Sequence, residues 1–329
     1  MRDLAAAGGA LVEYDGDALD RLALLFTLVK ILFLSGVVRP LPRLIALVER
    51  ARRASATPLH QTTVRNEHAY YCCIAQLTAL DRRDARDVAA AMRDARVRHF
   101  CGGSGGDGSG GDGSGDVEVV YMCGDSHALS PAWKALGGGG GGGARRVLVP
   151  ALVTGLKHWH LRPATNFYPK ANFYNVVARL PRGARVVFMF GEIDCREGIL
   201  VAVEKLRYDD VDEGIRATVA VWMAAALRLV DEKALDAYVH PIIPVLNETR
   251  HIVRAYNAQL EAAVKAAAPR LAWLDGVFDE LLTADGEHLR PEYALDGTHL
   301  HPRYLETLVG PSLDAAARAR GGSSSAPES

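Results

Sequence analysis

The sequence predicts an α/β protein, a parallel sheet with helices on both faces, preceded by an all-helical module. Residues 18–100 carry only helical spacing of apolar residues. Residues 102–116 consist entirely of Gly, Ser and Asp, a composition that cannot bury a core. From residue 117 onward, continuous apolar runs alternate with helical stretches, which favours parallel strands joined by helices. The expected parts are a helical module at 1–101, a linker at 102–116, an α/β domain at 117–318 and a disordered tail at 319–329.

The module is expected to contain four helical segments rich in Ala, Leu and Arg. They are residues 17–36, 39–55, 62–80 and 81–100. The first has an acidic start and a glycine at its end, as helices prefer. Its apolar run 22–38 is short for a membrane span and contains Lys30, so a buried helix is expected and no membrane span. The module is expected to supply no chemistry and to offer a surface to a protein partner.

The α/β domain is expected to alternate strands and helices. The strands are 117–123, 145–153, 184–192, 235–243 and 270–276, and the main helices are 205–232, 246–268 and 303–318. In an open parallel sheet, ligands bind beyond the carboxyl ends of the strands, so the residues that follow each strand are the candidates for a site. The glycine run 137–143 is followed by Ala-Arg-Arg and predicts a surface loop, because a phosphate-binding loop needs Lys-Ser/Thr there.

Composition argues against several classes of function. The 38 Lys and Arg balance 39 Asp and Glu, and the net charge of −1 gives no electrostatic case for nucleic acid or an anionic membrane as the main partner. Five cysteines, with no CxxC pair, predict neither a disulfide framework nor a zinc site. The N-terminus has acidic residues before any apolar run and makes a poor signal peptide. We therefore expect a cytoplasmic protein in a reducing compartment.

Polar residues follow the strands at the points where a site is expected. The first strand ends in GDSH at 124–127, and Ser-Pro at 130–131 predicts the N-cap and first position of a helix. Gly155 follows the second strand and GEIDCR at 191–196 follows the third. DGTH at 296–299 lies before the last helix.

These residue types fit nucleophilic catalysis. A serine hydroxyl is a poor nucleophile until a base takes its proton, and His299 can be the base for Ser126. Asp296, three residues before His299, can fix the imidazole tautomer and stabilise the imidazolium. The developing oxyanion needs donors, which the backbone N–H groups of Ser126 and Gly155 can provide.

At these residues the sequence resembles the SGNH/GDSL hydrolases. The resemblance rests on GDS at 124–126, the glycine after the second strand, GxxD at 191–194 and DxxH at 296–299, and it covers about residues 117–318. It implies a flavodoxin-like three-layer α/β/α sandwich, a Ser-His-Asp triad and an acyl-enzyme. The usual reaction of the family is ester hydrolysis, often deacetylation of sugars or cleavage of lipid esters.

One position departs from the family pattern. The third block of the family is usually Gly-x-Asn-Asp, and its Asn side chain donates to the oxyanion. Ile193 stands at that position and cannot donate; losing one such donor typically costs about 3 kcal/mol. Arg196, whose guanidinium has five donors, is the candidate substitute. Glu192 is expected to point away from the oxyanion or to pair with Arg196.

Other polar residues of these loops are expected to contact the substrate. They are Asp125, His127, Lys157, His158, Trp159, Glu192 and Asp194. Trp159 can stack on a sugar ring, and the basic residues around it can hold a carboxylate or phosphate. Asp194 also fits a structural role, because an acid at a strand end can accept backbone N–H bonds.

The function expected from the sequence is a serine esterase or deacylase that acts on a small-molecule or carbohydrate ester and needs no cofactor. An inactive binding domain is the first alternative, favoured by Ile193. An acyltransferase with the same triad is the second. A metal-dependent hydrolase is the third, because the pairs His158/His160 and His299/His301 could supply four nitrogen ligands.

Overall fold

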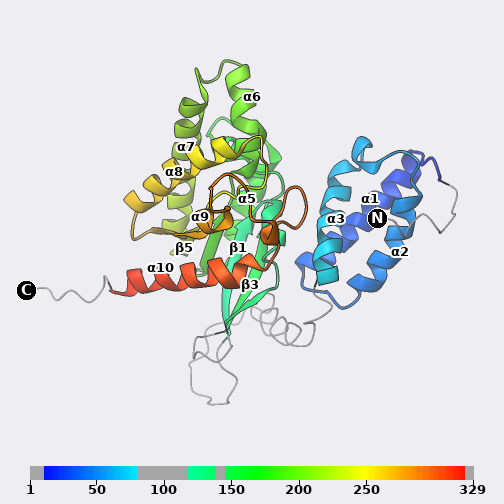
Figure 1. The fold of residues 1–329 in the computed structure, drawn as a ribbon, viewed down its shortest axis with the longest axis horizontal. Helices are drawn as coiled ribbons and strands as arrows, with labels where there is room; N and C mark the ends of the chain where they lie inside the picture. Colours follow the sequence, from blue (N-terminus) through cyan, green and yellow to red (C-terminus); the bar gives the residue numbers. More distant parts are fainter. Residues whose placement is uncertain (1–10, 81–116, 138–144, 323–329) are drawn as a thin grey trace, which may run out of the picture. The chain divides into compact units, whose positions relative to one another are not determined.

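The structure, a computed structural model, describes residues 11–80, 117–137 and 145–322. The chain divides into two compact units, Met1–Asp87 and Val88–Ser329 (Figure 1). The helix expected at 81–100, the linker and the end of the tail lie outside the described residues. The tail was expected to begin at residue 319, but the last helix continues to Gly322.

The described part of the first unit is helical. Its helices are α1 (Gly16–Leu34), α2 (Leu41–Ala54) and α3 (Arg65–Leu80). The Asp15 side chain caps α1 by accepting the N–H of Ala18 at 2.8 Å. α1 is not buried all round, because its Leu24 and Ile31 are exposed while Phe26 is buried. Among the described residues, no helix has the length and apolar content that a membrane crossing requires.

The second unit contains one sheet of six strands. They are β1 (Glu118–Gly124), β2 (Ala135–Leu136), β3 (Arg146–Leu152), β4 (Arg185–Met189), β5 (Asp236–Val239) and β6 (Leu271–Trp273). The strand order is β2-β3-β1-β4-β5-β6, and only the short edge pair β2–β3 is antiparallel. The α/β class and the five parallel strands expected from the sequence are therefore confirmed, whereas β2 was not expected.

Helices lie between the parallel strands and after the last of them. They are α5 (Tyr168–Ala178), α6 (Ile199–Glu204), α7 (Val211–Lys233), α8 (Arg250–Ala266), α9 (Val277–Leu281) and α10 (Gly310–Gly322). α8 lies within its expected stretch, α7 and α10 overlap theirs and end one and four residues later, and α5, α6 and α9 were not expected. Asp210 caps α7 by accepting the N–H of Glu213 at 2.8 Å.

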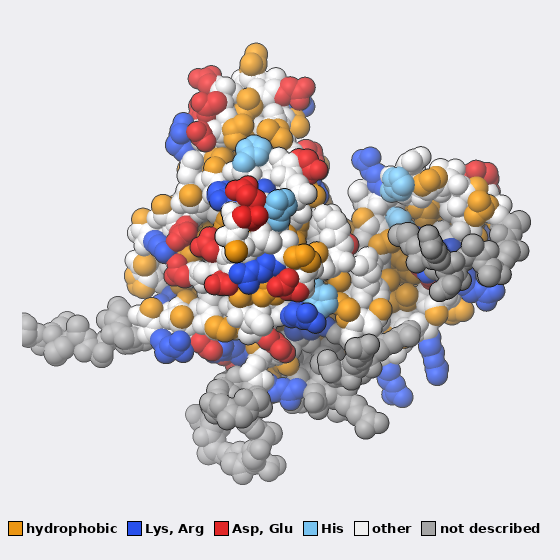
Figure 2. Space-filling view, in the orientation of Figure 1, with side chains coloured by type: hydrophobic (Ala, Val, Ile, Leu, Met, Phe, Trp, Pro, Cys, Tyr) orange, Lys and Arg blue, Asp and Glu red, His pale blue; other side chains and the backbone are white. Residues whose placement is uncertain are grey.

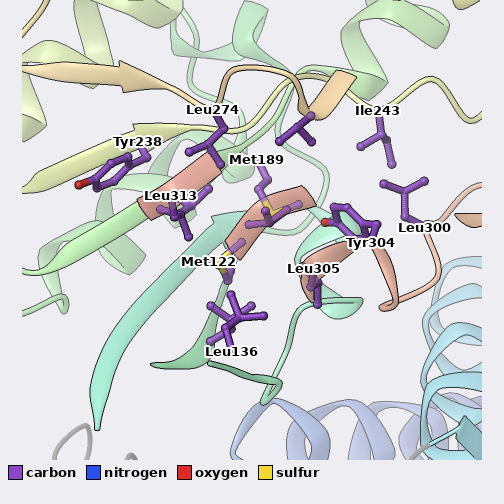
Figure 3. Close-up of a cluster of buried hydrophobic side chains, with 14 of the residues drawn as sticks. Met122, Leu136, Met189, Tyr238, Ile243, Leu274, Leu300, Tyr304, Leu305 and Leu313 are labelled. Carbon is purple, nitrogen blue, oxygen red and sulfur yellow. The ribbon is translucent and has the colours of Figure 1, made fainter. Parts of the chain in front are cut away.

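Both faces of the sheet are covered, as the alternation along β4 shows. Met189 belongs to a buried cluster that includes Tyr304 and Leu313, and α10 crosses this face of the sheet (Figures 1 and 3). Phe188 points to the opposite face, where it contacts Phe173 of α5 and Trp222 of α7. A continuous apolar run is thus explained by burial on both faces.

The topology fixes where a site can form. From β1 the chain passes to β3 on one side and then returns to β4 on the other side of β1. Such a reversal opens a crevice beyond the carboxyl ends of the two strands that flank it, here β1 and β4. Ser126 follows β1 and Glu192 follows β4, so both lie at this crevice.

Gly124 is required by the close approach of β1 to β4. A Cβ atom at this position would lie 2.7 Å from the Met189 carbonyl oxygen, which is backbone and cannot move away cheaply. We expect Gly124→Ala to lower the free energy of unfolding by about 1–3 kcal/mol, measured by urea denaturation. Gly297→Ala is the control, because a Cβ there meets no atom within 4 Å. Equal unfolding midpoints for the two variants would contradict the packing argument.

Candidate active site

Ser126 opens a short 3₁₀ turn, η3 (Ser126–Leu129), directly after β1. Asp125 holds this turn: its buried side chain accepts the N–H of His127 at 3.0 Å, and its carbonyl accepts the N–H of Ala128. Ser126 itself is only partly buried. The sharp turn therefore places the Ser126 side chain just beyond the carboxyl end of β1, a central strand of the sheet.

The helix expected after Ser130-Pro131 does not form. The Ser130 hydroxyl donates to the Leu300 carbonyl at 2.6 Å instead of capping a helix. Trp133 then takes a positive φ of 63° and donates its N–H to the Leu148 carbonyl, which starts the return toward β2. Contacts with distant parts of the chain thus decide the local conformation, and the N-cap prediction was wrong.

The backbone N–H groups of Ser126 and Gly155 are available to a ligand. The N–H of Val153 donates to the Gly124 carbonyl at 2.8 Å, which extends the β1–β3 pairing and places the Gly155 loop beside residues 124–126. Gly155 has a φ of +68°, a conformation that favours glycine. Among the described residues, neither the Ser126 N–H nor the Gly155 N–H donates to a protein acceptor. They can therefore donate to a developing oxyanion, as expected from the sequence.

Asp296 and His299 form a hydrogen-bonded pair. Asp296 Oδ2 lies 2.9 Å from His299 Nδ1, while Oδ1 accepts the N–H groups of Thr298 and His299 at 2.7 and 2.6 Å. Burial opposes ionisation of Asp296, but these hydrogen bonds outweigh it and lower its pKa. A carboxylate at Nδ1 can only accept, so Nδ1 carries the proton and Nε2 of neutral His299 is the basic nitrogen.

Long-range contacts bring this pair to the end of β1. The Ser130–Leu300 hydrogen bond joins the segment after Ser126 to the residue after His299. The rings of His127 and His299 have centroids 5.2 Å apart. His299 Nε2 is buried and makes no hydrogen bond with any described residue, Ser126 included. Catalytic hydrogen bonds are often long in unliganded proteins and tighten when substrate binds.

His127, Glu192 and Arg196 form a second polar group beside His299. His127 Nε2 donates to Glu192 Oε2 at 3.4 Å, and Arg196 Nη2 lies 3.6 Å from the same oxygen. Burial lowers the pKa of His127, but the carboxylates of Asp125 and Glu192 outweigh it and raise this pKa above its ordinary value. His127 Nδ1 is buried without a partner among the described residues. When the ring is protonated, Nδ1 carries an N–H that has no described acceptor, next to the candidate base.

Arg196, the expected substitute for the missing Asn, is engaged with a carboxylate. Its guanidinium is 38 % exposed and pairs with Glu192, as one of the two expectations for Glu192 required. Ile193 has no donor. His127, expected from the sequence only as a substrate contact, has a ring nitrogen, Nδ1, with no partner among the described residues.

The segment after β3 divides into structural and accessible residues. Asp194 is fully buried and accepts the N–H groups of His158 and Trp159 at 2.7 and 3.2 Å. His158 is buried, bonds Tyr256 Oη at 2.7 Å and packs on Trp222. These contacts favour structural roles for His158 and Asp194 in place of the expected substrate contacts. Lys157 and Trp159 stay partly exposed.

Sequence reasoning missed His240, which directly follows β5, at the carboxyl ends of the parallel strands. His240, His127 and Glu192 line a cavity of about 10 Å³. The ring donates Nδ1–H to the Pro241 carbonyl at 2.6 Å, and Nε2 has no partner among the described residues. A histidine directly after a buried strand was the available signal.

His240 is expected to make the fold acid-sensitive. Burial lowers its pKa to about 4, against 6.5 in the unfolded chain. Between these pH values the unfolded chain binds a proton that the folded protein does not, so stability is present above pH 6.5 and lost on acidification, by about 3 kcal/mol in total. His240→Asn keeps a donor near Nδ1 and removes the titration. Urea unfolding at several pH values should give a shallower acid loss for the variant, and parallel pH profiles would contradict this.

The four histidines of the metal alternative do not converge. His158 bonds Tyr256, His160 Nδ1 accepts the N–H of Lys157, and His301 accepts the N–H of Arg303. In the described part of the α/β unit, no three of their ligand atoms lie within 4.8 Å of one another. A cavity of about 480 Å³ lies beside the start of β6 and touches none of the site residues.

Comparison with protein-family models, curated proteins and solved structures found no match to this chain. The likeness to the SGNH/GDSL hydrolases therefore rests on the motifs and their geometry alone.

Proposed function

We propose that the α/β unit is a serine hydrolase of the SGNH type that cleaves an ester through an acyl-enzyme. The observation that carries the proposal is the Asp296–His299 pair. Nε2 of His299 has no partner among the described residues, and the His299 ring packs against that of His127, the residue after Ser126. The strand order supports the proposal: without β2, the parallel strands follow the flavodoxin-like order 2-1-3-4-5 in chain sequence. The helix-covered sheet is then the central layer of a three-layer sandwich.

Each group has a defined role in the proposed reaction. Ser126 Oγ attacks the ester carbonyl while His299 Nε2 takes its proton, and Asp296 stabilises the imidazolium that forms. The tetrahedral intermediate collapses when His299 returns the proton to the leaving alcohol, which leaves Ser126 acylated. Water, activated by the same His299, then hydrolyses the acyl-enzyme and releases the acid. The N–H groups of Ser126 and Gly155 bind the oxyanion in both steps.

His127 supplies the third oxyanion donor in place of the family's Asn. The carboxylates of Asp125 and Glu192 raise the pKa of the ring, and its Nδ1 has no hydrogen-bond partner among the described residues. We expect His127→Leu to lower kcat by about 10²- to 10³-fold. His127→Asn should lose less, because the Asn amide nitrogen can take the place of Nδ1. Steady-state kinetics on both variants provides the test, and a His127→Leu enzyme within threefold of the wild type would exclude this role.

The hydrolase proposal is tested by turnover of p-nitrophenyl acetate and of an O-acetylated monosaccharide, with and without an added alcohol acceptor. Release of acetate that depends on Ser126 supports a hydrolase. Transfer of the acetyl group to the alcohol in preference to water would favour the acyltransferase. Absence of any turnover by folded protein would favour the binding domain, the alternative that Ile193 supports.

A further inference from the structure

A cavity of about 280 Å³ opens between η4 (His158–Leu161) and α6. We call it the basic cavity. Its lining residues are Lys157, Trp159, His160, Gly198, Val201, Ala202, Lys205 and Arg207. Three cations and an aromatic ring thus face a floor of small residues, and no carboxylate lines the cavity.

The positive charge of the basic cavity is only partly neutralised. Lys157 Nζ bonds Glu197 at 2.9 Å, but Glu197 is 58 % exposed and screened by solvent. Lys205 and Arg207 form no ion pair with a described residue. Burial, with smaller contributions from the cations of Lys157 and Arg162, lowers the pKa of His160 to about 4, so His160 is neutral at pH 7. Unpaired cations around one cavity favour an anionic ligand.

The acids of this region serve other contacts. The upper part of the α/β unit, where α6 lies, carries both acidic and basic side chains, interspersed on the face shown in Figure 2. Asp210 and Glu213 accept backbone N–H groups at the start of α7. The mixed surface on this face does not favour a membrane.

The basic cavity shares its framework with the candidate active site. η4 follows the Gly155 loop, and α6 follows the residues after β4. Asp194 ties the two segments together through the N–H groups of His158 and Trp159. Both sites therefore lie beyond the carboxyl ends of the parallel strands, where one extended substrate can reach both.

Trp159 adds an apolar surface to the charge. The Arg162 guanidinium stacks on this ring, 3.1 Å from its centroid. An aromatic wall and several cations together suit a sugar ring with an acidic substituent.

From these contacts we infer that the basic cavity binds the anionic part of the substrate, a sugar ring that carries a carboxylate or a sulfate. That the ligand is a substrate rests on the proposed esterase function, but its binding to the cavity does not depend on turnover. It predicts an ester of an acidic saccharide as the substrate class.

Binding is measured by calorimetry on the full chain carrying Ser126→Ala, which cannot turn over. The probes are D-galacturonic acid, D-galactose 6-sulfate and neutral D-galactose. We expect both acidic sugars to bind at least about tenfold more tightly than D-galactose, with affinity falling as salt is added. A preference for one acidic sugar identifies the substituent.

Two double variants localise the site. Lys205→Ala with Arg207→Ala should weaken binding of the acidic sugars by about tenfold or more. Lys265→Ala with Arg270→Ala is the matched control, because it removes the same charges from exposed ion pairs beside the start of β6. Equal binding of all three sugars, no detectable binding at about 10 mM, or equal losses in both variants would overturn the inference. If the acidic sugars bind but Ser126 of the wild-type protein is unreactive, the esterase proposal is overturned and the binding inference stands.

Discussion

Replacing Ser126 by alanine is expected to lower kcat for ester hydrolysis by about 10⁴- to 10⁶-fold. The hydroxyl is the only group in the proposed mechanism that bonds covalently to the substrate, and the residual rate comes from the oxyanion donors alone. The fold should survive, because Ser126 Oγ makes no hydrogen bond with a described residue and the turn is held by Asp125.

The comparison variant is Ser312→Ala. Ser312 lies on α10, and its hydroxyl donates to the Asp275 carbonyl. The variant should keep the wild-type kcat, at a cost of about 1 kcal/mol in unfolding free energy. Steady-state kinetics and urea denaturation on both variants separate chemistry from folding. A Ser126→Ala enzyme that keeps more than a tenth of the wild-type kcat would exclude Ser126 as the nucleophile.

Asp296→Asn is expected to lower kcat by about 10⁴-fold, although it changes little else. The amide oxygen can keep the two backbone N–H bonds that Oδ1 accepts, so the loop should stay in place. The amide nitrogen then replaces Oδ2 and donates to His299 Nδ1. This selects the tautomer with the proton on Nε2, which cannot accept a proton from Ser126.

The chain contains a matched control for this change. Asp285 and His288 have the same spacing, and Asp285 Oδ1 also accepts a backbone N–H in its loop, but both side chains are exposed. Asp285→Asn should leave kcat unchanged. Kinetics at several pH values compares the two variants, and an Asp296→Asn enzyme within tenfold of the wild type would remove Asp296 from the triad.

The sequence predicted those features that depend on local patterns. Continuous apolar runs located the five parallel strands. The residues after the first strand and before the last helix gave Ser126 and the Asp296–His299 pair as candidates for the site. The Asp296-x-x-His299 spacing predicted their pairing, because three residues of loop can return a carboxylate to a nearby ring. Proline and serine signals failed at Ser130, where a bond to Leu300, 170 residues away, replaces the helix cap.

Side-chain roles set by distant partners could not be predicted. His158 resembled a substrate contact in its loop, yet its partner is Tyr256, 98 residues further along the chain. The hydrogen-bond partner of His127 is Glu192, 65 residues away, and no local pattern links the two. The order of the strands decides these contacts, and it was implied only by the family resemblance.

The central claim, an activated serine at position 126, is tested most directly by labelling the full chain with a fluorophosphonate probe. The account predicts one label per chain, located on Ser126 by peptide mass spectrometry and lost in both Ser126→Ala and His299→Ala. Folded wild-type protein that takes up no label, or label that persists in His299→Ala at the wild-type rate, would contradict it.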